Sequence, residues 1–173
     1  MDNSFTITPI DSKIVGPKII KINQTYYDKR GSLWEIFRKD EIESALGVEF
    51  VCDKLSVSKA HVLRGLHVNN VASKLMNVLN GSSCHVIVDL RPGSITCRKA
   101  FSIVMRSGEV MLYVPPGFAN GFYTLEDHTI VEYKLSEYYE NYEEEVVSWN
   151  SVNICNWPSE IIWNRIISDK DNT

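Results

Sequence analysis

Turn-forming residues break this chain into short segments, and their spacing limits the possible folds more than any other feature of the sequence. Four clear turn sites are Asn80-Gly81, Arg91-Pro92-Gly93-Ser94, Ser107-Gly108 and Pro115-Pro116-Gly117. The segments around them are rich in apolar and β-branched residues and predict strands over 50–56, 74–79, 83–90, 97–105, 110–114 and 129–135. Short strands with turns roughly every 8–12 residues are typical of an all-β sandwich or barrel.

A single short helix interrupts this β pattern. Asp40 can cap its N-terminus and Gly47 can end it. Ile42, Ala45 and Leu46 fall on one face between them, so the sequence predicts a helix over 40–46. After the last predicted strand, residues 157–173 mix apolar and charged side chains, which predicts a short C-terminal extension that wraps the barrel.

Length and charge narrow the class of protein. A chain of 173 residues fits one domain, 1–173, with a single sizeable core. Its net charge of −4 gives no attraction to nucleic acid or to an anionic membrane surface. The polar segment Met1–Ile10 does not resemble a signal peptide, and no window is apolar enough to span a membrane. We therefore expect a cytoplasmic protein.

The cysteines form no recognisable metal or redox motif. They are Cys52, Cys84, Cys97 and Cys155. Their spacing matches neither a C-x-x-C pair nor a zinc site, and a reducing compartment keeps such residues as small core side chains. We expect all of them to be free thiols.

Three longer motifs lie far apart along the chain. They are Val62-Leu63-Arg64-Gly65-Leu66-His67, Val114-Pro115-Pro116-Gly117-Phe118-Ala119-Asn120-Gly121-Phe122 and Glu132-Tyr133-Lys134-Leu135-Ser136-Glu137-Tyr138-Tyr139. Shorter segments are Arg30-Gly31-Ser32-Leu33-Trp34-Glu35-Ile36-Phe37, Val88-Asp89-Leu90-Arg91-Pro92-Gly93-Ser94, Ser148-Trp149-Asn150 and Ser168-Asp169-Lys170-Asp171. In this order, from about residue 17 to residue 171, the set resembles the dTDP-4-dehydrorhamnose 3,5-epimerase family.

This resemblance implies a fold, a partner and a reaction. The fold would be a cupin jelly roll, a double-stranded β-helix, in a homodimer whose subunits exchange N-terminal strands. Neither a metal nor an organic cofactor would be required. The expected substrate is a nucleoside-diphosphate 4-keto-6-deoxy sugar, a hexose or a heptose, used in making a surface polysaccharide such as capsule or lipopolysaccharide. The expected enzyme is an isomerase that inverts C3, C5 or both.

Inversion beside a ketone needs three chemical groups. A proton on a carbon next to a carbonyl is weakly acidic, so a base must remove it while another group stabilises the enolate oxygen. A second donor must return a proton to the opposite face of the ring. By resemblance, His67 is the base and Asp171 orients its imidazole. In the same way, Lys74 is assigned to the enolate oxygen and Tyr133 to the second proton.

The resemblance also implies residues that bind the substrate. Arg30 and Arg64 match a diphosphate clamp, since a planar guanidinium suits bidentate binding of phosphate oxygens. Glu35 matches a carboxylate that contacts substrate, and Tyr138 matches an aromatic that flanks the nucleotide base. The remaining expected binding residues are Lys54, Asn120 and Lys170.

The sequence departs from the family pattern at two positions that we interpret as linked. Asn120 stands where the family usually has a histidine, and His85 stands where it usually has an aspartate. The nucleotide-side segment F-V-Q-D-N reads Phe50-Val51-Cys52-Asp53-Lys54 here, and a thiol cannot replace the paired donor and acceptor of an amide. The nucleotide, dTDP, GDP or CDP, and the inverted carbon therefore stay open.

Three other kinds of protein share features with this sequence. The histidines are His61, His67, His85 and His128. This set gives poor support to a metal-dependent cupin, whose last histidine position is Asn120 here. A non-catalytic cupin that binds sugar nucleotides would not need His67, Tyr133 and Asp171 together. A nucleotide-sugar 3,4-ketoisomerase of the same fold would use similar base chemistry, so only the product distinguishes it.

Overall fold

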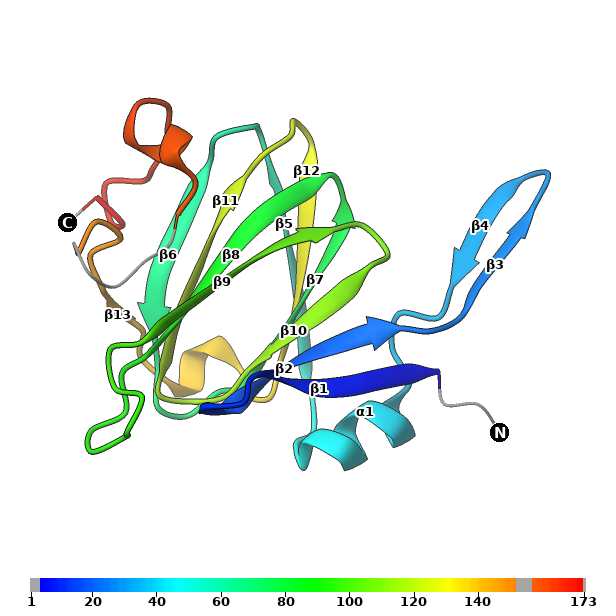
Figure 1. The fold of residues 1–173 in the computed structure, drawn as a ribbon, viewed down its shortest axis with the longest axis horizontal. Helices are drawn as coiled ribbons and strands as arrows, with labels where there is room; N and C mark the ends of the chain where they lie inside the picture. The colour runs from blue at the N-terminus through cyan, green and yellow to red at the C-terminus, as the bar shows by residue number, and fades with distance from the viewer. Residues whose placement is uncertain (1–3, 152–156, 173) are drawn as a thin grey trace.

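The computed structural model describes residues 4–151 and 157–172 and has two antiparallel sheets packed face to face (Figure 1). The larger sheet has the order β1 (Phe5–Asp11), β2 (Ile14–Ile22), β10 (Val110–Val114), β7 (Lys74–Asn80), β12 (Thr129–Leu135) and β5 (Cys52–Ser58). The smaller sheet has the order β13 (Glu145–Val146), β6 (Leu63–Val68), β11 (Phe118–Thr124), β8 (Ser82–Asp89) and β9 (Ala100–Arg106). This arrangement confirms the all-β jelly roll expected from the sequence.

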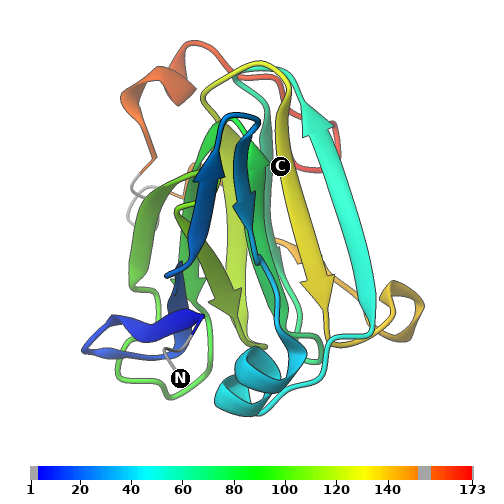
Figure 2. The ribbon, with the colours of Figure 1, turned by 90° about the vertical axis from the view of Figure 1, so that its right-hand side faces the viewer.

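Three short helices and one hairpin complete the fold. The helices are α1 (Lys39–Leu46) and the single-turn 3₁₀ segments η1 (Tyr139–Asn141) and η2 (Ser159–Ile162). The hairpin pairs β3 (Thr25–Asp28) with β4 (Gly31–Trp34) and projects away from the two sheets (Figures 1 and 2). None of the described helices is long and apolar enough to cross a membrane.

The main core lies between the two sheets. Met76 and Leu112 of the larger sheet pack there with Ile87 and Phe122 of the smaller sheet, and all of these side chains are buried. Strands β8 and β11 are buried at every position, because a second apolar cluster covers their outer face. In that cluster Trp157, from the C-terminal extension, packs over the smaller sheet. The extension therefore does cover the barrel, as the sequence predicts.

The helix is one residue longer than expected and begins differently. Arg38 is its N-cap residue, without a side-chain capping bond, and Asp40 lies in the first turn. A carboxylate there still favours the helix, because the N-terminal end of the helix dipole is positive. Gly47 ends the helix in the left-handed conformation, with φ of 67°. Ile42 is fully buried and anchors the helix on the outer face of the larger sheet.

Several strands differ from the sequence-based expectation. The strand expected over 50–56 runs from Cys52 to Ser58, and the one expected over 97–105 begins only at Ala100. The ranges predicted from turns and apolar segments do not include strands β1 to β4, β6, β11 and β13, although the family resemblance implies N-terminal strands without giving their bounds. In β6 and β11 the glycines Gly65 and Gly121 interrupt the apolar pattern, and burial on both faces removes the alternation that marks a strand.

The cysteines agree with the expectation as far as the structure describes them. Cys52, Cys84 and Cys97 are free thiols, and burial raises the pKa of the Cys84 thiol to about 11. Cys155 lies outside the described residues.

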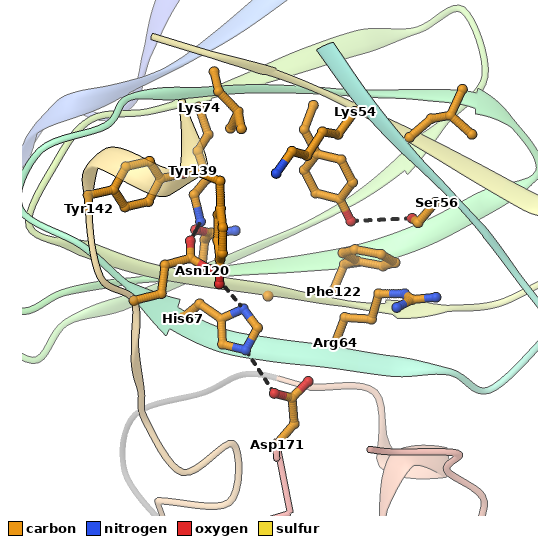
Figure 3. Close-up of a pocket in the computed structure, with 15 residues that line it drawn as sticks. Lys54, Ser56, Arg64, His67, Lys74, Asn120, Phe122, Tyr139, Tyr142 and Asp171 are labelled. Atoms are coloured by element: carbon orange, nitrogen blue, oxygen red, sulfur yellow. Dashed lines mark hydrogen bonds and ion pairs between the residues drawn. The ribbon is translucent and has the colours of Figure 1, made fainter. Parts of the chain in front are cut away.

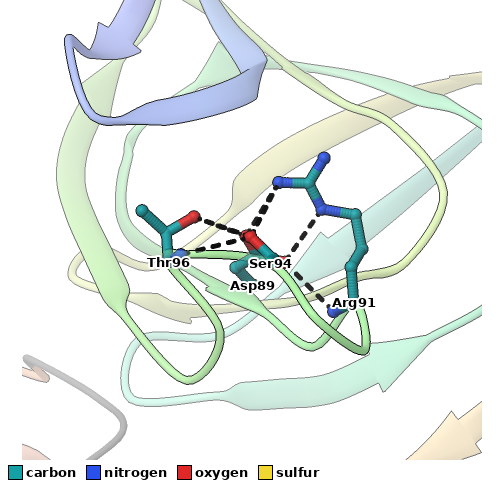
Figure 4. Close-up of polar contacts among 4 residues, drawn as sticks. All are labelled: Asp89, Arg91, Ser94 and Thr96. Atoms are coloured by element: carbon teal, nitrogen blue, oxygen red, sulfur yellow. Dashed lines mark hydrogen bonds and ion pairs between the residues drawn. The ribbon is translucent and has the colours of Figure 1, made fainter.

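A buried carboxylate explains why β9 starts late. The Asp89 side chain ends β8 with no exposed surface and accepts two bonds from the Arg91 guanidinium, at 2.9 and 2.8 Å (Figure 4). It also accepts hydroxyl bonds from Ser94 at 2.7 Å and Thr96 at 2.6 Å. These contacts fold residues 89–99 into a turn, so Cys97 cannot belong to the next strand.

The same contacts set the charge state of Asp89. Burial alone would raise the pKa of this carboxyl, but bonds from Arg91, Thr96 and Ser94 outweigh burial and hold it well below its usual range. A lowered folded-state pKa adds stability at pH values above the unfolded pKa of about 3.9. That contribution is lost as pH falls through the folded-state pKa.

We predict that Asp89→Asn lowers the free energy of unfolding by roughly 3 kcal/mol at pH 7, because a neutral amide at this buried position loses the charge-assisted bonds from Arg91, Ser94 and Thr96. Urea unfolding followed by circular dichroism measures this. The difference from wild type should shrink as pH falls below about 4, because the unfolded wild-type chain then binds a proton at Asp89 that the folded protein does not bind. Asp40→Asn on the exposed helix is the control and should cost about 0.5 kcal/mol. Equal losses in the two variants would contradict the prediction.

Candidate active site

A pocket of about 290 Å³ opens between the two sheets (Figure 3). Six of the expected site residues that line it are Lys54, Arg64, His67, Lys74, Asn120 and Tyr133. Asp171, from the C-terminal segment, is the seventh. The jelly roll thus gathers side chains from β5, β6, β7, β11 and β12 at one end of the barrel, although they are far apart in sequence.

A β-bulge between β6 and β11 aims two of these side chains into the pocket. Asn120 pairs with His67 and Phe122 pairs with Arg64, so the register shifts between the two pairs. In a regular strand, residues three apart point to opposite faces. The bulge changes the local twist so that both Arg64 and His67 line the pocket.

Two glycines make this bulge possible. A Cβ on Gly65 would lie 2.7 Å from the backbone oxygen of Asn120, and a Cβ on Gly121 would lie 2.6 Å from that of Arg64. Real side chains essentially never approach so closely, so the two backbones can meet only where neither residue has a Cβ. The glycines in the R-G-L-H and A-N-G-F motifs thus face each other across one contact.

His67 is held by a carboxylate from the end of the chain. Its Nε2 lies 2.8 Å from an Asp171 oxygen, and the other Asp171 oxygen accepts the backbone N–H of Gly65 at 3.1 Å. Because an ionised carboxylate only accepts hydrogen bonds, this contact places the imidazole proton on Nε2. The Nδ1 atom of the neutral ring then carries the free lone pair.

The segment that carries Asp171 is itself tied to β6. The backbone N–H of Leu63 donates to Ile166 at 2.9 Å, and the N–H of Ile166 donates to His61 at 2.7 Å. The Tyr123 hydroxyl donates to the Asn164 carbonyl at 2.6 Å and lies 2.7 Å from His61 Nδ1. These contacts fix the C-terminal segment beside the strand that carries His67.

Lys74 meets a carboxylate that the sequence analysis did not identify. Its Nζ lies 2.5 Å from a Glu144 oxygen, and both side chains are less than 10% exposed. The other Glu144 oxygen lies 3.6 Å from His67 Nδ1. Glu144 is the middle member of a run of three glutamates, and only its register next to β13 brings this one into the pocket. The sequence offers no signal that selects it from its neighbours.

Tyr133 lies in the same pocket in its protonated form. Burial raises the pKa of its hydroxyl to about 12, although a contact with Ser56 and the positive charge of Arg64 both lower it. The hydroxyl lies 3.3 Å from the Ser56 oxygen. A phenol that keeps its proton at neutral pH can serve as a donor.

The two residues that depart from the family pattern do not bond to each other in the described part of the chain. Asn120 Nδ2 contacts the sulfur of Met76 at 3.6 Å, while its Oδ1 is buried without a partner. His85 is fully buried, and its Nε2 lies 2.9 Å from the Ser83 hydroxyl. Burial lowers the pKa of His85 to about 3, so its ring stays neutral. We find no direct link between the two changes.

Four expected residues do not line the pocket of a single chain. Arg30 pairs with Asp28 in the projecting hairpin, and Glu35 pairs with Arg38 before α1. The others are Tyr138 and Lys170, both exposed. Their roles in binding substrate stay predictions.

Two aromatic residues that the sequence analysis did not select do line the pocket. Tyr139 lies next to Tyr138 in the chain, and the ammonium of Lys54 is 4.4 Å from its ring centroid. Tyr142 lines the same wall and packs edge-on against Tyr139, with ring centroids 5.6 Å apart.

In residues 4–151 and 157–172, no group of three His, Cys, Asp or Glu side chains is arranged to hold a metal ion.

We predict that Gly121→Ala destabilises the protein by roughly 2 kcal/mol, because the new methyl group overlaps the Arg64 carbonyl oxygen. The forced separation of β6 from β11 should also reduce enzyme activity, since it moves His67. Thermal unfolding and activity assays measure the two effects. Gly47→Ala is the control, because its Cβ meets open space and only its positive φ costs about 1 kcal/mol. A stable, fully active Gly121→Ala protein would refute this account of the bulge.

Comparison with known proteins agrees with the fold and the pocket. The family model for dTDP-4-dehydrorhamnose 3,5-epimerase matches residues 11–173. The dTDP-4-dehydrorhamnose 3,5-epimerase of Methanothermobacter thermautotrophicus is 36% identical over 153 residues, which are 86% of this chain and 83% of that protein.

Two solved structures show the same similarity. The dTDP-6-deoxy-D-glucose-3,5-epimerase of Legionella pneumophila, in complex with dTDP-4-keto-L-rhamnose, has a TM-score of 0.86 and 33% identity and covers 96% of this chain and 89% of its own. The structure of the dTDP-4-dehydrorhamnose 3,5-epimerase of Bacillus anthracis, with TDP and PPi bound, matches with a TM-score of 0.84 and 34% identity. The match covers 96% of this chain and 97% of that chain. The chain therefore belongs to the dTDP-4-dehydrorhamnose 3,5-epimerase family and is an isomerase.

Proposed function

We propose that this enzyme binds a nucleoside-diphosphate 4-keto-6-deoxy sugar in the pocket and inverts C3, C5 or both, with His67 as base and Tyr133 as acid. The observation that carries the proposal is the contact of His67 Nε2 with Asp171 at 2.8 Å, in a pocket that also contains Lys74 and Tyr133. A base, a cation and a protonated donor in one cavity are the three groups that the reaction needs.

The first step is the removal of a proton from the carbon beside the ketone. The lone pair on His67 Nδ1 takes the proton, and the electrons of the C–H bond move into an enolate. Asp171 stabilises the imidazolium that forms, because it already accepts the Nε2 proton. The ammonium of Lys74 stabilises the negative charge on the enolate oxygen.

The second step returns a proton to the other face of the ring. The Tyr133 hydroxyl donates this proton, which leaves a phenolate that recovers a proton from solvent. The positive charge of Arg64 favours the phenolate, since it acts to lower the pKa of Tyr133. His67 returns to its neutral form by losing its extra proton to solvent.

The substrate class follows from the family and from the cations at the pocket. The Legionella relative is in complex with dTDP-4-keto-L-rhamnose, so a dTDP-linked 4-keto sugar is the first substrate to test, with GDP and CDP sugars beside it. Arg64 is exposed at the pocket and can bind diphosphate oxygens. Lys54 over the Tyr139 ring supplies a second cation beside a flat aromatic surface for the nucleotide base.

Asn120 offers a contact to the sugar itself. Its Oδ1 atom is buried at the pocket and has no partner among the described residues. A buried acceptor without a hydrogen bond costs roughly 1–3 kcal/mol, which a donor on the ligand can recover. We propose that a sugar hydroxyl donates to this oxygen, so Asn120 helps to choose the sugar.

We also propose that the active form is a homodimer in the cytoplasm and that each subunit lends Arg30 and Glu35 to its partner's pocket. Arg30 lies in the turn between β3 and β4, and Glu35 directly follows β4. This hairpin projects away from its own sheets (Figure 1). Its exposed apolar residues Tyr26, Tyr27 and Leu33 favour coverage by another chain. The free thiols Cys52, Cys84 and Cys97 suit a reducing compartment.

Solvent exchange in deuterium oxide tests the two catalytic roles separately. We predict that His67→Asn abolishes deuterium incorporation at every sugar carbon, because the amide cannot take up the proton that the imidazole removes. Tyr133→Phe keeps the ring packing and should still exchange deuterium through His67, but should form at least 100-fold less inverted product. Mass spectrometry and NMR of the sugar measure label and configuration.

Several outcomes of this experiment would contradict the assignment. Near-normal exchange by His67→Asn would exclude His67 as the base. Full inversion by Tyr133→Phe would mean that water or another side chain is the acid. A product with its carbonyl at C3 instead of C4 would identify a ketoisomerase.

Mixed dimers test whether Arg30 acts across the subunit interface. We predict that Arg30→Ala and His67→Asn homodimers are each impaired, but that a heterodimer of the two recovers activity. In that heterodimer, one pocket has its own His67 and receives Arg30 from the other subunit. Co-expression with two affinity tags isolates the heterodimer, and kcat/KM should approach half the wild-type value. If Arg30 serves its own pocket, no site is complete and no activity returns.

A further inference from the structure

Glu144 is a buried carboxylate between two groups that change charge during the proposed reaction. Its side chain is 8% exposed, and its two oxygens face different partners. One oxygen lies 2.5 Å from Lys74 Nζ, and the other lies 3.6 Å from His67 Nδ1. No step of the proposed reaction described so far uses this residue.

The contact with Lys74 keeps a buried cation charged. The Lys74 side chain is only 9% exposed, and loss of water around an ammonium group favours the neutral amine. A neutral amine could not stabilise an enolate by its charge. The Glu144 carboxylate opposes that loss of charge and holds the ammonium at the pocket wall.

The contact with His67 becomes important only after the proton has moved. In the neutral ring, Nδ1 carries a lone pair and has no attraction to the carboxylate. Once Nδ1 has taken the proton, the imidazolium is flanked by Asp171 on one nitrogen and Glu144 on the other. A charge contact that strengthens as the reaction proceeds lowers the barrier and does not tighten the binding of substrate.

We propose that Glu144 is a positioning residue that keeps Lys74 charged at the enolate oxygen and balances the imidazolium of His67 after proton transfer. This inference rests on the proposed function, since it needs His67 as the base. The other charged or titratable side chains that line the pocket are Lys54, Arg64, Tyr133, Tyr139, Tyr142 and Asp171. Among these, only Asp171 is also negative at neutral pH, and it contacts the opposite nitrogen of His67.

The test is the pH profile of Glu144→Gln, which keeps the shape of the side chain and removes its charge. We expect kcat to fall roughly 100-fold while KM changes less than about threefold, because the contact acts after binding. Both limbs of the profile should move to lower pH, because the variant lacks a negative charge that favours the protonated forms of neighbouring groups. A residue needed only for folding would lower activity without moving both limbs together.

Two further variants act as controls. Glu143→Gln removes the same charge from the exposed neighbour and should keep both the rate and the profile of wild type. Glu144→Asp keeps the charge, so its profile should stay at the wild-type pH even if its rate falls. Circular dichroism shows whether Glu144→Gln folds. If it does not fold, Glu144→Asp is tested in its place, and a pH profile of Glu144→Asp that lies at lower pH than that of wild type would overturn the proposal.

A double variant shows whether Glu144 acts through Lys74. Adding Glu144→Gln to a Lys74→Met enzyme should lower kcat less than 10-fold, compared with roughly 100-fold in the wild-type background. Equal factors in the two backgrounds, or an unmoved pH profile in Glu144→Gln, would overturn the role of Glu144. If the wild-type enzyme turns over no 4-keto sugar nucleotide, both the proposed function and the role of Glu144 are refuted. If His67→Asn is inactive while Glu144→Gln has the kcat and pH profile of wild type, only the role of Glu144 is refuted.

Discussion

The pocket depends on how closely β6 and β11 approach each other at Gly65 and Gly121. Any Cβ at either position would overlap the opposite backbone, so the two strands meet only through glycine. This approach creates the bulge that turns both Arg64 and His67 to the same side. The absence of side chains at these two glycines therefore sets the position of His67, the candidate base, relative to Arg64, a candidate phosphate-binding residue.

The second requirement is that the end of the chain returns to this bulge. Asp171 accepts a bond from the backbone of Gly65 and another from His67, so it contacts both the bulge and the imidazole. Trp157 and the bonds of Ile166 hold this last segment against the smaller sheet. The same C-terminal segment thus covers the outer face of β8 and β11 and orients the imidazole of His67.

The sequence predicted the fold class and most of the pocket, but not the contacts between distant segments. The turn at Asn80-Gly81 places β7 and β8 within one residue of their observed bounds, because turn chemistry is local. Motif resemblance found His67 and Asp171, which the fold brings to 2.8 Å. Glu144 was missed because the choice among three adjacent glutamates depends on pairing of β13 with β6, which no local pattern encodes. Arg30 and Glu35 lie outside the pocket of a single chain, so their roles in binding substrate stay predictions.

The departures at positions 85 and 120 add no charged group at or behind the pocket. His85 stacks on Phe122 at 5.3 Å, and Phe122 in turn packs against Tyr133 at 6.2 Å. Burial lowers the pKa of His85 to about 3, so this ring adds no charge near the reacting centre at neutral pH. Asn120 cannot titrate either, and its side-chain oxygen has no partner among the described residues. With neutral groups at both positions, the proton transfers of the proposed mechanism stay with His67 and Tyr133, and we propose that Asn120 acts instead on which sugar the pocket binds.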